Sequence, residues 1–195
     1  GAVTLIYSLS GGIRTVVWVD SIQFILYLFG GIASILIVLN LLDQSFFEAI
    51  SILAAEGKLD IFNWQGDFFK EPYYFLSAIA GGALLSLSSH GVDYMMVQRV
   101  LGTRNLDSAR KAMVGSGIFV FLQFSVFLLA GSLIYLLMGG VELERDREFT
   151  SFIVNYLPIG LEGVLLAGVL SAAMSTLSSS INSLASSTVT DWLGG

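Results

Sequence analysis

The sequence contains no cysteine and only one histidine, His90, among its 195 residues. Disulfides and thiol chemistry are therefore excluded, and a lone imidazole cannot build a histidine-rich metal cluster. Charged residues are also scarce, at 12% of the chain, whereas an ordinary soluble domain holds about 25%. The net charge is −6, which argues against a nucleic-acid partner because phosphate binding needs a basic surface.

The chain is instead rich in apolar residues. Hydrophobic residues make up 55% of it, and its mean hydropathy is +0.80. A soluble domain of this size could not bury so many apolar side chains and keep a polar surface. We therefore expect an all-α membrane protein with the lipid bilayer as its main partner.

Four apolar runs are long enough to cross a bilayer, which takes roughly 20 helical residues. They cover residues 15–42, 73–98, 112–138 and 161–187. Residues 1–10 are too few to span and are expected to be the end of a helix that Gly11 and Gly12 break. Because apolar stretches lie close to both ends, we interpret the chain as a fragment of a larger protein.

Positive charge predicts the orientation of these spans, because cytoplasmic loops are enriched in lysine and arginine. Arg14 and the basic loop 99–111 are therefore expected inside. The loop at 43–72, with six acids and two lysines, and the acidic loop at 139–160 are expected outside. The first of these also contains a weakly amphipathic stretch, FFEAISILAAEG, which predicts a short interfacial helix.

The last span carries a stripe of small polar residues at helical spacing, which Thr176 and Ser179 widen. Its members are Ser171, Ser175, Ser178, Asn182 and Ser186. Neutral oxygens of this kind suit a cation such as Na⁺ without placing a permanent charge in the membrane. Packing against a neighbouring helix is the alternative, because small residues line many such contacts.

Asp20 lies inside the first full span, where an ionisable group is costly and indicates a function. The alternative is a carboxylate that reaches water at the cytoplasmic boundary, since Arg14 is only six residues away.

The second span holds a cluster of residues that favours a break in the helix, with Gly81 and Gly82 followed by Ser86–Gly91. Small-residue packing is the alternative. His90 and Asp93 are three residues apart and could share a hydrogen bond or relay a proton. A satisfied histidine, or one that faces a water-filled cavity, is the simpler interpretation of His90.

Three segments of the chain resemble the sodium/solute symporter family. They are YSLSGGIRTVVWVDSIQ at residues 7–23, SSHGVDYMMVQRVLGTRNLDSARK at residues 88–111, and GLEGVLLAGVLSAAMSTLSSSINSLASSTVTD at residues 160–191. The resemblance implies a transporter core of two inverted five-helix repeats. This chain would hold the end of core helix four and then helices five to eight.

The resemblance also implies where sodium, the transported coupling ion, would bind. The family's common sodium site uses one carbonyl and two hydroxyls of helix eight, and these positions fall on Ala172, Ser175 and Thr176. Some members hold a second ion, whose positions here are Ser175, Ser178, Ser179 and Asp20.

On the substrate side the chain departs from the sugar carriers of the family. Ser86, Ser89 and His90 stand where those carriers have an asparagine, a tyrosine and a tryptophan, and Val120 stands where they have a lysine. We therefore expect a carboxylate-bearing solute, such as an organic acid or an amino acid, rather than a hexose. Gln123 is a further pocket candidate, although a buried glutamine bonded to a neighbouring helix would look the same.

Together these features predict a non-enzymatic, sodium-coupled symporter of a small solute, with several spans in the plasma membrane. The main alternative is a solute-sensing membrane module of a larger signalling protein. An intramembrane enzyme that uses His90 and Asp93, and a passive channel, are further alternatives.

Overall fold

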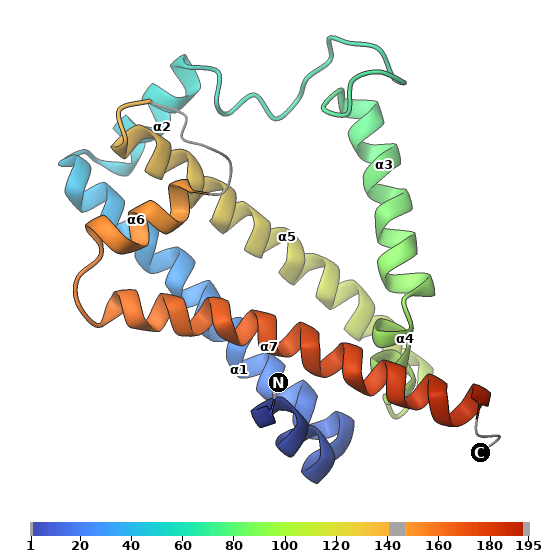
Figure 1. Cartoon of the computed structure of the whole chain (residues 1–195). Coiled ribbons are helices and arrows are strands. Elements are labelled where there is room, and N and C mark those ends of the chain that lie inside the picture. The colour runs from blue at the N-terminus through green and yellow to red at the C-terminus, as the bar shows by residue number, and fades with distance from the viewer. Residues whose placement is uncertain (1, 141–146, 193–195) are drawn as a thin grey trace. The chain divides into compact units, whose positions relative to one another are not determined.

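The computed structural model describes residues 2–140 and 147–192, and within these ranges the chain is helical and forms no strand (Figure 1). The helices are α1 (Ala2–Leu42), α2 (Phe46–Ala55), α3 (Phe75–Leu87), α4 (Tyr94–Leu101), α5 (Leu106–Leu137), α6 (Glu148–Tyr156) and α7 (Leu161–Ser187), with two π-helical turns, η1 (Ser88–Val92) and η2 (Thr188–Trp192).

Four helical segments of the described chain are long and apolar enough to cross a membrane. They are Val17–Leu42, Phe75–Val92, Leu106–Leu137 and Leu161–Trp192. An all-α membrane protein with four full spans is therefore confirmed. The short helix expected after the first span is α2. Helix α6 lies in the acidic segment at 139–160, and residues 141–146 of that segment are outside the described part.

The first predicted boundary is wrong, because α1 runs through Gly11 and Gly12 without a break. A glycine in a helix interior costs only about 1 kcal/mol relative to alanine. In a bilayer, an interrupted helix would leave several backbone groups without partners, which costs more. The side chains of residues 1–14, including the motif residue Tyr7 and the orienting Arg14, lie outside the described side chains.

The boundaries around the basic loop also differ from those predicted. The second span does not continue to residue 98, because the chain becomes extended at Asp93, with φ −64° and ψ 116°. Helix α5 begins at Leu106 rather than at 112, because the Asn105 side chain accepts a hydrogen bond from the Ser108 amide at 2.8 Å and caps it. Much of the predicted loop 99–111 is therefore helical.

Helix α2 begins with a reciprocal cap between Ser45 and Glu48. The Ser45 amide and hydroxyl donate to the Glu48 carboxylate at 2.8 Å and 2.7 Å, and the Glu48 amide donates back to the Ser45 hydroxyl at 3.3 Å. The bond from the Ser45 hydroxyl holds the pKa of Glu48 below its ordinary value. The cap is therefore complete at neutral pH and weakens as the pH falls and the carboxylate takes up a proton.

By their contacts, the residues form two compact units, Gly1–Ala49 with Phe119–Gly195, and Ile50–Ile118. In the first unit α7 packs along α1. The buried apolar side chains of this unit include Val38, Leu133, Ile134, Phe152 and Leu165, from α1, α5, α6 and α7.

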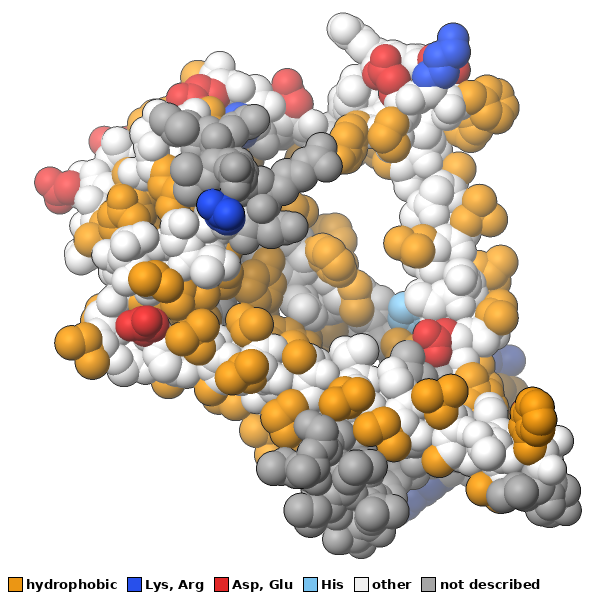
Figure 2. All heavy atoms as spheres, in the orientation of Figure 1, with side chains coloured by type: hydrophobic (Ala, Val, Ile, Leu, Met, Phe, Trp, Pro, Cys, Tyr) orange, Lys and Arg blue, Asp and Glu red, His pale blue; other side chains and the backbone are white. Residues whose placement is uncertain are grey.

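The second unit contains α3, a span none of whose residues is buried. Hydrophobic side chains project along the length of this helix, and charged side chains gather at the loop that precedes it (Figure 2). A helix that is apolar all round and uncovered is suited to lipid or to further helices of a larger protein.

Candidate functional site

The site is built on the antiparallel contact of α1 with α7. Gly30 lies against Leu165, Tyr27 lies against Gly168, and Asp20 bonds to Ser175. From the first contact to the second, and from the second to the third, the residue number falls along α1 by as much as it rises along α7, so the two helices run antiparallel. Steps of three and seven residues keep one face of each helix turned toward the other. We call this contact the α1–α7 seam.

Toward the start of α1, a carboxylate of the seam meets a hydroxyl of α7. The Ser175 hydroxyl donates to Oδ1 of Asp20 at 2.5 Å, joining residues that are 155 positions apart. This length lies at the short end of the range for a hydrogen bond to a charged carboxylate. Asp20 is therefore turned toward the serine stripe of α7, which favours the functional interpretation over a carboxylate that merely reaches water.

Two further members of the predicted second ion site lie within one turn of Ser175. Ser178 is fully buried and Ser179 nearly so. They follow Ser175 by three and four residues, which places all three hydroxyls on one side of α7. Asn182, the next member of the predicted stripe, lies outside the side chains that the structure describes.

The predicted first ion site is arranged differently. The Ala172 carbonyl accepts a hydrogen bond from the Thr176 hydroxyl at 3.2 Å, and both residues are exposed. Their oxygens lie on α7, one turn apart. The third residue of this set, Ser175, is shared with the second set and is the one that contacts Asp20 of α1.

Gln23 is a residue of the seam that sequence reasoning did not single out. It is only 7% exposed, and its side-chain oxygen has no hydrogen-bond partner among the described residues. It follows Asp20 by three residues and so shares its face of α1. The spacing could have identified it, whereas its unpaired oxygen could be seen only in the structure, and such a buried group calls for an explanation.

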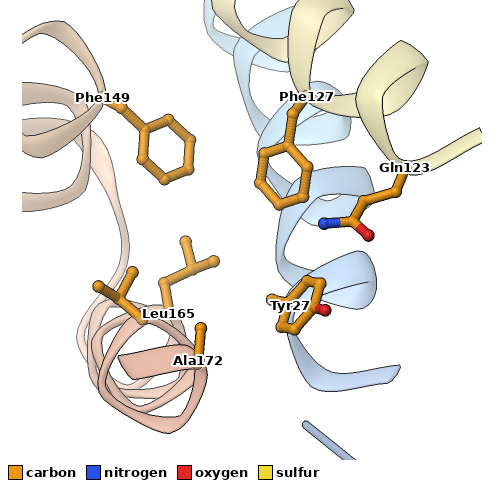
Figure 3. A pocket seen from close by; sticks show the side chains of 8 residues that line it. Tyr27, Gln123, Phe127, Phe149, Leu165 and Ala172 are labelled. Atoms are coloured by element: carbon orange, nitrogen blue, oxygen red, sulfur yellow. The ribbon is translucent and has the colours of Figure 1, made fainter. Parts of the chain in front are cut away.

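Gln123 lines a cavity of about 290 Å³ in the first unit, between α1, α5, α6 and α7. Its amide lies within hydrogen-bonding reach of the Tyr27 hydroxyl. Figure 3 shows Tyr27, Gln123 and Phe127 on one side of the cavity and Phe149, Leu165 and Ala172 on the other. Gln123 therefore lies close to a polar group of a neighbouring helix and also faces a space, which leaves both interpretations of it open.

The other predicted solute residues lie in the second unit, at the π-helical turn η1. The predicted discontinuity falls on Ser88–Asp93, whereas the helix is continuous through Gly81 and Gly82. Single π-helical turns are rare and often mark functional sites. Ser86 closes the preceding helix and accepts a weak bond from the Ser89 hydroxyl at 3.4 Å.

The ring of His90 bonds to Ser89 rather than to Asp93, so the His90–Asp93 hydrogen bond that the spacing allows is not formed. Nδ1 lies 2.8 Å from the Ser89 hydroxyl, and Nε2 is buried without a partner among the described residues. The extended backbone at Asp93 turns that residue out of the helical register in which i and i+3 meet. Nε2 of His90 is thus available to bind a ligand.

In the described part of the chain, no three His, Cys, Asp or Glu side chains gather as a transition-metal site would require. The polar groups of the seam are instead one carboxylate with hydroxyl and amide oxygens. Oxygen ligands of this kind suit a hard monovalent cation.

Comparisons with known proteins find a family of sodium-coupled transporters. The family model described as "Sodium:solute symporter family" matches residues 1–193. The chain is 25% identical over 200 residues to the sodium/sialic acid symporter NanT of Aliivibrio fischeri, covering 98% of this chain and 39% of that protein. It is 30% identical over 204 residues to the sodium-dependent multivitamin transporter of Oryctolagus cuniculus, covering 98% and 31%.

A third relative is sodium-coupled monocarboxylate transporter 1 of Mus musculus, 26% identical over 202 residues, with coverage of 98% and 32%. The chain thus spans about a third of the length of the curated relatives it matches. No solved structure matches it.

Proposed function

This chain belongs to the sodium:solute symporter family, and on that premise we propose that it is part of a carrier in which sodium drives the uptake of a small organic solute. The family and its membrane character are established by the match and the four spans. The coupling ion, the solute and the plasma membrane as its location belong to the proposal.

The observation that carries the proposal is the hydrogen bond from Ser175 to Asp20 across the α1–α7 seam. Asp20, Ser175, Ser178 and Ser179 offer one charged and three neutral oxygens to an ion. In the structure, the Ser175 hydroxyl donates its hydrogen to the Asp20 carboxylate. When sodium binds, that hydroxyl would rotate and present a lone pair to the ion.

Transport then follows from differences in affinity between conformations. Sodium entering from the outside would stabilise the conformation in which the seam and the solute pocket are formed. After the helices rearrange, ion and solute would leave toward the cytoplasm past Asp20. Coupling requires that sodium bind the two conformations with unequal affinity. Ala172, Ser175 and Thr176 would hold the ion of the family's common sodium site, together with ligands from a helix outside this chain.

We assign the solute to organic acids or amino acids rather than hexoses. Ser86, Ser89 and His90 offer hydroxyls and one free imidazole nitrogen, and Gln123 offers an amide beside an aromatic cavity. Two of the relatives are named for acids, sialic acid and monocarboxylates. Uptake by the full-length protein of labelled organic acids, amino acids and sugars, with and without sodium, tests both the coupling and the solute class.

A solute sensor built on the same bundle is the second candidate. It would bind the same ligands and pass the signal to a soluble domain. Sodium-dependent accumulation of solute against its gradient in vesicles that contain only the full-length protein supports a carrier. Binding without accumulation would favour the sensor.

Gln23 is expected to contribute to sodium binding. Gln23→Met keeps a long unbranched side chain and removes the amide oxygen, so sodium activation of uptake should require a several-fold higher sodium concentration. Gln23→Glu, which restores an oxygen, should recover part of that loss. The measurement is the sodium dependence of solute uptake by the full-length protein. Equal sodium dependence in Gln23→Met and the wild type would limit Gln23 to packing.

His90 is expected to affect the solute and not the ion. In His90→Leu the free Nε2 atom is lost, so the Michaelis constant for an acidic solute should rise while half-maximal sodium stays unchanged. His90→Gln, which restores a polar side-chain nitrogen, is the matched variant. A change in sodium activation with an unchanged solute constant would contradict the assignment.

A further inference from the structure

The loop before α3 presents an unusual number of exposed apolar and aromatic side chains. They are Ile61, Phe62, Trp64, Phe68, Phe69 and Tyr73. Phe69 is 91% exposed and Tyr73 84%. We call residues 61–73 the aromatic loop. Contiguous apolar surface of this kind marks an interaction site rather than an ordinary water-exposed loop.

The aromatic loop is fastened to the first turn of α3. The Phe75 amide donates to the Asn63 carbonyl at 2.8 Å, and the Ser77 hydroxyl donates to the Phe68 carbonyl at 2.6 Å. The rings of Trp64 and Phe75 lie 4.5 Å apart between centroids. The loop is therefore held in a fixed position against the first turn of α3.

The start of α3 is expected to lie at the edge of a membrane. Phe75 begins a candidate span that continues to Val92, so the first turn of α3 lies where hydrocarbon gives way to headgroups. Aromatic side chains are favoured at this depth, where the ring is apolar and a polar tip can reach water. The same loop also carries Asp67 and Lys70, which pair at 3.4 Å on its exposed side and suit the aqueous side of the boundary.

A hollow of about 770 Å³ lies between the loop and α3, with a lining that mixes Asp60, Asn63 and Gln65 with Phe62, Trp64 and Tyr73. Carboxylate, amide and aromatic groups side by side match the boundary between a lipid headgroup and its acyl chain. The surplus of acids over lysines in residues 60–73 disfavours anionic lipids. We propose that the aromatic loop is embedded in the zwitterionic lipid interface and anchors the entrance of α3 there.

Site-directed spin labelling of the full-length protein in phosphatidylcholine vesicles tests this placement. The present chain has no cysteine, so single cysteines are introduced at Phe69 or Tyr73 in a background without other cysteines. Lys70→Cys is the matched control in the same loop, and Leu84→Cys is the reference within the span. The readout is the ratio of collisions with oxygen, which concentrates in lipid, to collisions with a water-soluble nickel complex.

The labels at Phe69 and Tyr73 are expected to show a ratio several-fold above that at Lys70 and approaching that at Leu84. Ratios equal to that at Lys70 would overturn the proposal, because they would place the loop in water. Low collision rates with both reagents would overturn it as well, because another part of the protein would then cover the loop. Two labelled positions are used so that the test still stands if one cysteine variant does not fold. The result is independent of sodium and solute.

Discussion

Replacing Asp20 by asparagine is expected to raise the sodium concentration for half-maximal uptake by about an order of magnitude or more, since opposite unit charges about 4 Å apart attract by roughly 4 kcal/mol near a protein surface and desolvation offsets part of this. Asparagine keeps the size of the side chain and removes its charge. The Ser175 hydroxyl would still find an acceptor, so the seam should hold its structure. The measurement is the sodium dependence of uptake by the full-length protein, with the Michaelis constant for the solute determined at saturating sodium.

Ser175→Ala should act in the same direction with a smaller effect, because it removes one neutral oxygen and leaves the carboxylate. Ser34→Ala is the control. Ser34 is fully buried on α1, but its hydroxyl is satisfied by the Gly30 carbonyl of the same helix at 2.8 Å. Its loss should leave sodium activation unchanged. Unaltered sodium dependence in both Asp20→Asn and Ser175→Ala would refute the ion site.

The second large effect is expected where Gly168 of α7 packs against the backbone of α1 at Tyr27. A Cβ atom on Gly168 would lie 3.7 Å from Cβ and 3.8 Å from Cα of Tyr27, which is ordinary contact. Gly168→Ala should therefore be tolerated. Gly168→Leu places further atoms against the backbone of α1 and should destabilise the protein by about 1–3 kcal/mol, the usual cost of overpacking.

Because Ser175 follows Gly168 by two turns on the same face, the separation of the helices should also weaken the bond to Asp20. We expect Gly168→Leu to lower the melting temperature of the purified full-length protein and to raise half-maximal sodium. Gly163→Leu is the control, since nothing lies within 4 Å of a Cβ atom there. Equal effects of the two leucines would show that close packing at Gly168 has no special role.

The sequence predicted the features of this chain that depend on local composition. Four spans follow from hydropathy because a bilayer demands about 20 apolar residues in each helix. The stripe from Ser171 to Ser186 follows from helical spacing. Neither property joins Asp20 to Ser175, which are 155 residues apart, and the resemblance to a family was needed to pair them.

The remaining features depend on more than local composition and could not be predicted from it. The continuity of α1 through Gly11 and Gly12 reflects a balance between a small propensity cost and backbone hydrogen bonding. The His90–Asp93 bond that the spacing allows is not formed, because a π-helical turn and an extended residue replace regular helix there. That the side-chain oxygen of Gln23 has no hydrogen-bond partner among the described residues can be found only when the positions of its neighbours are known.

Direct binding of radioactive sodium to the purified full-length protein is the most direct test of the central claim, that the α1–α7 seam holds the coupling ion. It requires no knowledge of the solute. Saturable binding is expected in the wild type and in Ser34→Ala, with a marked loss of affinity for at least one ion in Asp20→Asn. Wild-type affinity and stoichiometry in the combined Asp20→Asn and Ser175→Ala variant would contradict the account.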